Sequence, residues 1–259
     1  MGKNKLARWT ELGGYPNVIQ PEIGSVFAKD HPIKGKWNSE MFRNNNPVVL
    51  ELGCGKGEYS VGLAARFPEK NFIGIDIKGA RMWRGARTAN EQKMNNVAFI
   101  RTRIEFVTSF FRSDEVDEIW VTFPDPHPGL RNSNKRLSSP WFLNGYRQFV
   151  KNNGLVHLKT DNSELYNYTK EVALHNGLQI IYATNDLYSA NAPDESIPVV
   201  KTEAMVDSET FSTFRSEILS IQTHYEKLFM AKGFNINYIA FRLEKDKIIE
   251  DASRKTKNE

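Results

Sequence analysis

From residue 47 onward, short runs of apolar residues alternate with stretches whose apolar residues recur at helical spacing. The apolar runs are continuous, as in Val48-Val49-Leu50, which is typical of strands buried on both faces of a parallel sheet. This alternation predicts an α/β fold with a mostly parallel, seven-stranded sheet that helices cover on both faces. The strands are expected at 48–52, 71–76, 97–101, 117–122, 154–160, near 178–183 and at 235–243. The helices are expected at 58–67, 79–94, 104–112, 139–152, 163–175 and 213–232.

The segments around and within this regular pattern are more polar. Residues 1–46 are expected to form an irregular N-terminal extension, which four aromatic residues hold against the main domain at 47–243. Residues 184–212 contain two prolines and are expected to be an insertion or lid within that domain. Residues 244–259 form a charged tail that is expected to fray. The four aromatic residues are Trp9, Tyr15, Phe27 and Trp37.

Composition places the chain among ordinary globular proteins. Its 259 residues are 40% hydrophobic and 25% charged, which suits one domain with a large core. No apolar run approaches the length of a membrane span and no signal peptide is recognised, so we expect a cytoplasmic protein without membrane contact. The single cysteine, Cys54, excludes an internal disulfide, and no histidines stand at metal-ligand spacing, so no metal is expected. The net charge of +4 permits a nucleic-acid partner without requiring one.

The run from Val48 to Gly57 combines a buried strand, a glycine-rich turn and the start of a helix. Such a unit can hold a nucleotide-like ligand against the backbone, because glycine adopts positive φ and has no Cβ to block the ligand. Glu51 stands just before the turn, and its carboxylate would repel a pyrophosphate but attract a cationic ligand. S-adenosylmethionine carries a sulfonium and an ammonium, so we expect this cofactor to bind at Glu51, Gly53 and Gly55.

The predicted strand at 71–76 ends in a second acid, Asp76, about twenty residues after the glycine turn. At this position in nucleotide-binding α/β proteins a carboxylate reaches the two hydroxyls of a ribose. The structural alternative is an N-cap for the helix that begins near Gly79. The ribose role is favoured because Glu51, the glycine turn and Asp76 fall in register.

A second motif, Phe123 to Pro128, follows the strand at 117–122. Prolines on both sides of Asp125 restrict the backbone and fix the direction of its carboxylate. The structural alternative is a rigid turn in which Asp125 acts as a cap. Basic residues follow the motif, and basic groups beside a methyl-donor pocket suggest a substrate with a phosphodiester backbone. These residues are Arg131, Lys135 and Arg136.

In these motifs the chain resembles the bacterial tRNA (guanine-N7-)-methyltransferases, a family that methylates guanine 46 of tRNA. The resemblance implies a Rossmann-like class I methyltransferase fold with an antiparallel last strand, S-adenosylmethionine as cofactor and tRNA as substrate. The Phe-Pro-Asp-Pro motif followed by a basic stretch is its most specific part. The matching segments are Glu51-Leu52-Gly53-Cys54-Gly55-Lys56-Gly57, Phe72-Ile73-Gly74-Ile75-Asp76, Phe123-Pro124-Asp125-Pro126, Asn134-Lys135-Arg136, Lys159-Thr160-Asp161 and Thr223-His224-Tyr225-Glu226.

The resemblance also assigns roles to the matching positions. Glu51, Gly53, Gly55 and Asp76 contact the cofactor in this assignment, and Asp125 contacts both cofactor and guanine and is catalytic. Where the family commonly has Asp or Asn after the third strand, this chain has Arg103, so the adenine is expected to meet Arg103 and backbone groups of Ile104. The implied tRNA contacts are Arg131, Lys135, Arg136, Asp161, Thr223, His224, Tyr225 and Glu226.

The chain departs from the family pattern directly after the Phe-Pro-Asp-Pro motif. His127 stands where the family usually has Trp, and Gly129-Leu130 stands where it usually has lysines. Arg131 is retained. The loop is therefore less positive than in the family, and it lacks a basic group that the family uses to bind its substrate.

The expected chemistry is simple in terms of protons. Guanine N7 has a lone pair and no proton, so alignment of the reactants is the main requirement. We expect Asp125 to hold the N–H edge of the base and offset its developing positive charge, while Asp161 helps to place the nucleotide. The alternatives are a methyltransferase for another RNA base, an RNA-binding module with an inactive cofactor pocket, and an NAD-dependent oxidoreductase, which the position of Glu51 disfavours. Both a monomer and a homodimer are compatible with the sequence.

Overall fold

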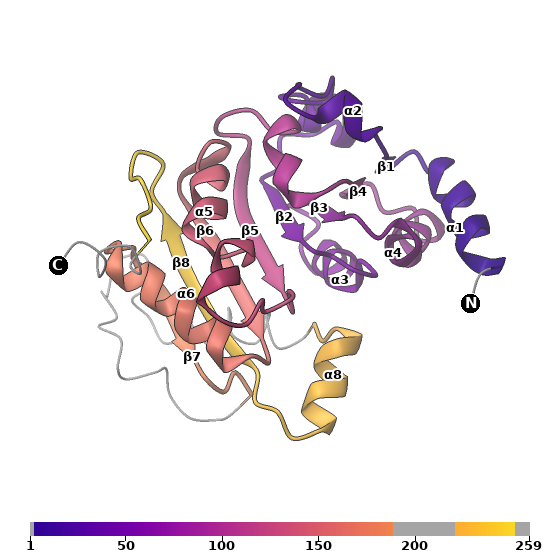
Figure 1. The fold of residues 1–259 in the computed structure, drawn as a ribbon. Helices are drawn as coiled ribbons and strands as arrows, with labels where there is room; N and C mark the ends of the chain where they lie inside the picture. Colours follow the sequence, from indigo (N-terminus) through magenta and orange to yellow (C-terminus); the bar gives the residue numbers. More distant parts are fainter. Residues whose placement is uncertain (1–2, 189–220, 252–259) are drawn as a thin grey trace.

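The computed structural model describes residues 3–188 and 221–251. Within them, eight strands form one sheet in the order β1-β4-β3-β2-β5-β6-β8-β7. Only β8 runs against its neighbours, pairing antiparallel with β6 and β7, whereas the other pairs are parallel (Figure 1). The strands are β1 (Val18–Ile19), β2 (Val48–Leu52), β3 (Asn71–Asp76), β4 (Val97–Arg101), β5 (Val116–Thr122), β6 (Val150–Thr160), β7 (Ile180–Thr184) and β8 (Asn237–Leu243).

Helices pack on both faces of this sheet and divide the core into two clusters. Residues of β2 show the division, since Leu50 and Leu52 face one cluster and Val49 faces the other. One cluster lies under α1, α3 and α4, and the other lies under α5 and α6. The helices are α1 (Lys3–Gly13), α2 (Ile23–Val26), α3 (Glu58–Arg66), α4 (Gly79–Glu91), α5 (Pro140–Tyr146), α6 (Ser163–His175) and α8 (His224–Ala231). Shorter helical segments are η1 (Trp37–Phe42), η2 (Ile104–Ser109) and η3 (Leu130–Lys135).

The N-terminal segment is more ordered than its polar sequence suggested. It contains α1, which lies beside α4, and the two-residue strand β1, which adds an eighth strand to the seven expected (Figure 1). Trp37 is fully buried and its Nε1 donates a hydrogen bond to the Phe110 carbonyl at 2.9 Å. Trp9 stacks under the Arg101 guanidinium at 4.1 Å. The N-terminal segment is therefore folded and packs against the rest of the molecule.

Three other expectations differ from the structure. The helix expected at 139–152 ends at Tyr146, and β6 begins at Val150, because Asn153 with φ of 61° lets the chain bulge and join the sheet early. The segment expected as a helix at 104–112 is the 3₁₀ helix η2. In the tail, Ile249 is buried and both its N–H and its carbonyl bond to the Asn144 side chain, so the described part does not fray.

Part of the predicted insertion lies outside the described residues. Of 184–212, the structure describes 184–188 only, and of the helix expected at 213–232 it describes α8. In the described ranges, no helix has the length and apolarity needed to cross a membrane. The same ranges contain no group of three or more His, Cys, Asp or Glu placed to hold a metal ion.

The order of the strands fixes where a ligand can bind. From β2 the chain proceeds outward to β3 and β4, and then crosses back to place β5 on the other side of β2. In open α/β sheets the carboxyl ends of the strands at such a reversal form a crevice. The ends of β2, β3 and β5 carry Leu52, Asp76 and Thr122, so both sequence motifs meet at this crevice.

Candidate active site

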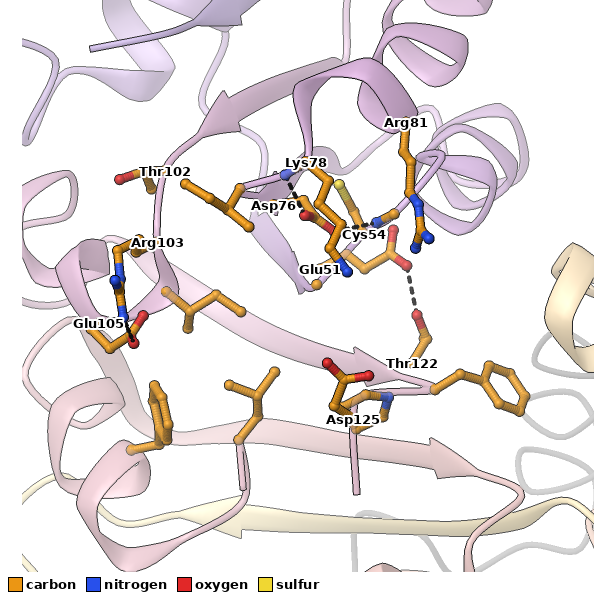
Figure 2. Close-up of a pocket in the computed structure, with 18 of the residues that line it drawn as sticks. Glu51, Cys54, Asp76, Lys78, Arg81, Thr102, Arg103, Glu105, Thr122 and Asp125 are labelled. Carbon is orange, nitrogen blue, oxygen red and sulfur yellow. Dashed lines mark hydrogen bonds and ion pairs between the residues drawn. The ribbon is translucent and has the colours of Figure 1, made fainter. Parts of the chain in front are cut away.

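A cavity of about 1020 Å³ opens at the carboxyl ends of β2, β3 and β5. Its walls contain every residue expected to contact the cofactor, although these residues come from four separate stretches of chain. Figure 2 shows Glu51 and Asp76 on one side of the cavity and Asp125 on the other. The expected cofactor residues in the walls are Glu51, Gly53, Gly55, Asp76, Arg103, Ile104 and Asp125.

Glu51 is buried, with 4% of its surface exposed, and its carboxylate is held by three hydrogen bonds. Ser60 donates from its backbone N–H at 2.9 Å and from its hydroxyl at 2.5 Å, and the Thr122 hydroxyl donates at 2.7 Å (Figure 2). Burial raises the pKa of Glu51 to about 7, although these hydrogen bonds lower it. The charge of this group is therefore sensitive to a cationic ligand near neutral pH.

The glycine turn lies between β2 and α3 and is tied to the end of β3. Asp76 accepts hydrogen bonds from the Gly55 N–H at 2.9 Å and from the Lys78 N–H at 2.7 Å. The carboxylate thus connects the turn to β3, and no side-chain cap is formed at the start of α4. Gly53 has φ of 80°, and a Cβ there would come no closer than 3.9 Å to any atom, so this side of the turn is open space.

Gly57 is required for packing instead. Its φ is 70°, and an added Cβ would lie 2.6 Å from the Phe99 ring. The positive φ and the close approach both demand glycine, because any side chain would have to push α3 away from the sheet.

The loop after β5 directs Asp125 toward the cavity (Figure 2). The residues two positions before and after Asp125 have left-handed backbone conformations that are rare outside glycine. These are Phe123, with φ of 47°, and His127, with φ of 43°. The Phe123 N–H donates to the Lys159 carbonyl at 2.8 Å, which ties the start of the loop to β6. Asp125 itself is exposed and in position to contact a ligand.

The segment after β4 forms another part of the cavity wall. The Arg103 guanidinium pairs with Glu105 at 2.8 Å, and both side chains are partly exposed. Ile77, Ile104 and Leu137 add apolar surface to the same cavity. An apolar slot with a charged edge suits a flat heterocycle such as adenine.

Comparison with known proteins identifies the family. Residues 45–216 match the family model of a putative methyltransferase. A tRNA (guanine-N(7)-)-methyltransferase of Bacteroides fragilis is 43% identical over 246 residues, which is 95% of this chain and 88% of the relative. The enzyme of the same name from Porphyromonas gingivalis is 46% identical over 231 residues, covering 88% of this chain and 85% of the relative.

The chain belongs to the tRNA (guanine-N(7)-)-methyltransferase family. Among solved structures, one titled as an antibiotic-related methyltransferase aligns with a TM-score of 0.55 at 14% identity, covering 83% of this chain and 96% of the other. The 16S rRNA methyltransferase KamB aligns with a TM-score of 0.51 at 14% identity, covering 83% and 95%. These likenesses confirm the predicted class I methyltransferase fold.

Membership of this family confirms the predicted reaction class, methyl transfer with S-adenosylmethionine as the donor. The cavity fits that molecule, because two acids, an open glycine turn and an apolar slot occur in one space. Glu51 and the turn at Gly53 would hold the cationic part, and Asp76 the ribose. These contacts were expected from the sequence, and the structure brings all of them together without testing each role.

The residues expected to contact tRNA are less closely grouped. Lys135, Thr223 and Tyr225 line the cavity. Asp161 and His224 are not among the cavity walls, and the His224 N–H donates to Glu58. Arg131 is exposed outside the cavity walls on η3, where a nucleic-acid backbone could still reach it.

Two of the expected tRNA contacts are inside the protein. The Arg136 side chain is only 2% exposed and bonds to Glu164, so a phosphate cannot reach its guanidinium in this structure. Glu226 is fully buried and pairs with Lys159 at 2.5 Å. Both residues were expected at the substrate interface because a sequence shows charge but not burial. Their tRNA contacts stay predictions, and the burial of both side chains does not favour them.

Several residues that line the cavity or hold its side chains were not expected from the sequence. Ser60 and Thr122 orient Glu51, and Thr122 could have been noticed as the last residue of a strand just before the Phe-Pro-Asp-Pro motif. Lys78 and Arg81 also line the cavity, and Figure 2 shows both at its edge. Trp141 lines the cavity while 55% exposed, and no local pattern pointed to it.

Proposed function

We propose that the protein transfers the methyl group of S-adenosylmethionine to N7 of a guanine in tRNA, at position 46. The observation that carries this proposal is the Phe-Pro-Asp-Pro loop, which places Asp125 across one cavity from the glycine turn. The relatives named as tRNA (guanine-N(7)-)-methyltransferases support it, because their similarity extends over nearly the whole chain.

The bound cofactor supplies an electrophilic methyl group on a sulfonium. The protein's residues need not remove a proton, because guanine N7 carries none. Asp125, which lines the cavity, would accept hydrogen bonds from the N–H edge of the base and offset the positive charge that develops on the purine. The loop and the glycine turn contribute by holding the two reactants in line.

Recognition of the RNA backbone would come from the basic rim of the same cavity. Lys56, Lys78, Arg81 and Lys135 all line it. Tyr225 lies there as well, 39% exposed, at the end of a stack in which its ring centroid is 6.4 Å from that of Phe229. An exposed aromatic face of this kind suits a splayed base. A tRNA substrate also supports a cytoplasmic location, which we propose, whereas the choice between monomer and homodimer stays a prediction.

The test is methyl transfer to bulk tRNA from a strain that lacks the endogenous enzyme. Labelled S-adenosylmethionine is added, the tRNA is digested to nucleosides, and 7-methylguanosine is the expected product. Cleavage of the labelled tRNA at 7-methylguanosine should map the label to position 46. Label in another nucleoside would favour a methyltransferase for a different RNA base. Cofactor binding by calorimetry with no transfer to any tRNA would favour the RNA-binding module with an inactive pocket.

A further inference from the structure

The Arg136 guanidinium lies beneath the loop that carries Asp125 and contacts that loop, Glu164 and Tyr168. Its Nε donates to the carbonyls of Pro126 at 3.1 Å and His127 at 3.2 Å. One terminal nitrogen donates to Glu164 Oε1 at 2.5 Å. The guanidinium also lies 4.4 Å from the centre of the Tyr168 ring.

Glu164 connects Arg136 to a further part of the same loop. The same oxygen that receives the Arg136 bond also accepts the Gly129 N–H at 3.1 Å. Glu164 is in the first turn of α6, where a negative charge is favoured by the helix dipole. Its hydrogen bonds to Gly129 and Arg136 lower the pKa of this carboxyl, so it is ionised at neutral pH. The two residues therefore hold three closely spaced parts of the loop, at Pro126, His127 and Gly129.

The loop needs such an anchor. The left-handed conformations of Phe123 and His127 are strained, and they persist only when surrounding contacts enforce them. Pro124, Pro126 and Pro128 have no N–H, so the loop can make few backbone hydrogen bonds of its own. An arginine can satisfy two carbonyls and a carboxylate at once because its guanidinium is a rigid fork of five donors.

We propose that Arg136 and Glu164 form a clamp that holds the Asp125 loop in its active shape, and that Arg136 is a positioning residue rather than a phosphate contact. This rests on the proposed function, in which Asp125 meets the base. Since Glu164 balances the charge of Arg136, the pair attracts a phosphodiester only weakly. The clamp is thus expected to affect turnover more than tRNA affinity.

Charge distinguishes the clamp from a phosphate contact, because the two residues of the pair have opposite signs. Removing Glu164 should strengthen or preserve tRNA binding if electrostatic attraction is what matters. Removing it should lower kcat if the clamp matters. Glu164 is 54% exposed, so Glu164→Gln is expected to fold normally. Glu171→Gln, which removes another exposed acid from α6 away from the loop, is the matched control.

The experiment measures kcat and KM for tRNA, together with the salt dependence of tRNA binding, in four variants. In Glu164→Gln and Arg136→Lys, kcat should fall roughly tenfold or more, since small displacements of a catalytic group carry such effects. The salt slope should be unchanged in both, and Glu171→Gln should behave as wild type. In Lys135→Gln, which changes a cavity residue, the slope should fall by roughly one instead, with the main effect on KM. Wild-type kcat in Glu164→Gln would overturn the clamp.

Hydrogen–deuterium exchange of the peptide that spans 123–131 tests the clamp without relying on turnover. Exchange in this peptide should speed up in Glu164→Gln and Arg136→Lys while the rest of the chain exchanges as in wild type. Unchanged exchange would overturn the proposal. If wild-type protein showed no methyl transfer, the proposed function would fail, and the exchange result would still decide whether the clamp holds the loop.

Discussion

At the scale of single residues, Glu51 carries the clearest titration. Burial raises the pKa of its carboxyl to about 7, so this group gains or loses its proton near neutral pH. A cation placed beside it would favour the ionised form and expel that proton. Cofactor affinity should therefore rise with pH, because below pH 7 binding must first remove the proton.

We predict that S-adenosylmethionine binds about tenfold more tightly at pH 7.0 than at pH 5.5, as measured by calorimetry. This range avoids ionisation of the amino group of the ligand. In Glu51→Gln, which cannot ionise, the affinity should be weaker and nearly constant over the same range. An equally steep dependence in that variant would assign the proton to another group.

Asp125 gives the second residue-scale prediction. Asp125→Asn keeps the size of the side chain but removes the negative charge, so the base is still contacted and its positive charge is no longer offset. We expect kcat for tRNA to fall about 100-fold, in line with the loss of one electrostatic contact in the transition state. Cofactor affinity should fall much less than kcat, because Glu51 and Asp76 still hold the cofactor. A variant that loses cofactor binding and keeps kcat would make Asp125 a cofactor ligand instead.

At the scale of elements, the start of α8 is attached to β6 through buried charges. Lys159 and Glu226 are both fully buried and 2.5 Å apart, and the Tyr188 hydroxyl donates to the same carboxylate. Thr223 and Glu226 also form a reciprocal capping box at the helix start, with both bonds at 3.2 Å. This arrangement places Thr223 and Tyr225 at the cavity wall.

Removing one partner of the Lys159–Glu226 pair should lower the free energy of unfolding more than removing the capping hydroxyl does. Glu226→Gln leaves the Lys159 ammonium buried beside a neutral group, and we expect a loss of about 3 kcal/mol in the free energy of unfolding. Thr223→Ala removes only a capping hydroxyl, which is worth about 1 kcal/mol. Urea unfolding of both variants, with Thr223→Ser as the control that keeps the hydroxyl, measures the difference. Equal losses of stability in Glu226→Gln and Thr223→Ala would show that the ion pair contributes no stability beyond that of the cap.

Elements whose signal is local could be predicted from the sequence. The bounds of β2, β3 and β4 agree with the expected ranges, because each is a continuous apolar run between polar turns. The end of α5 could not be predicted, since the chain leaves it to pair Val150 with Val116 across the sheet. The two residues of β1 have too little sequence to signal a strand, and they depend on their pairing with β4.

The residues of the candidate site fall into the same two groups, those with a local signal in the sequence and those without one. Glu51, Asp76 and Asp125 could be predicted, because each stands at a strand exit inside a short motif. The burial of Arg136 and Glu226 could not be predicted, since their partners Glu164 and Lys159 are distant in sequence and only the folded chain brings each pair together. A charged residue near a motif thus indicates where a site lies along the chain. Tertiary contacts decide whether its side chain points into that site or into the protein.

At the scale of the whole molecule, a buried polar cluster joins β5, β6 and β8. Trp120 and His157 stack with ring centroids 4.0 Å apart, and the Tyr238 hydroxyl is 2.7 Å from the His157 ring nitrogen. Glu118 accepts a hydrogen bond from Trp120 at 2.5 Å and lies 3.1 Å from His157 Nε2. Lys70 reaches the same carboxylate at 3.2 Å. The antiparallel strand β8 is thereby connected to β5 and β6 by side-chain contacts as well as by backbone pairing.

This cluster predicts how the fold responds to acid. Burial by itself would raise the pKa of Glu118, but His157 and Lys70 lower it from 4.5 to about 2. The unfolded chain binds the proton more readily than the folded one, so this contribution to stability is present above pH 4.5 and is lost as the pH falls toward 2. Between pH 6 and pH 3 the loss should be about 2 kcal/mol.

Urea unfolding of wild type and Glu118→Gln at pH 6 and pH 3 isolates this loss, because the other carboxyls titrate alike in both proteins. The variant should be the less stable protein at pH 6, since glutamine cannot balance the Lys70 ammonium beside it. The gap between the two proteins should narrow by about 2 kcal/mol at pH 3, where the wild-type carboxylate is held ionised at a growing cost. A gap that stays constant over this range would mean that Glu118 titrates as it does in the unfolded chain, and the cluster would then contribute packing alone.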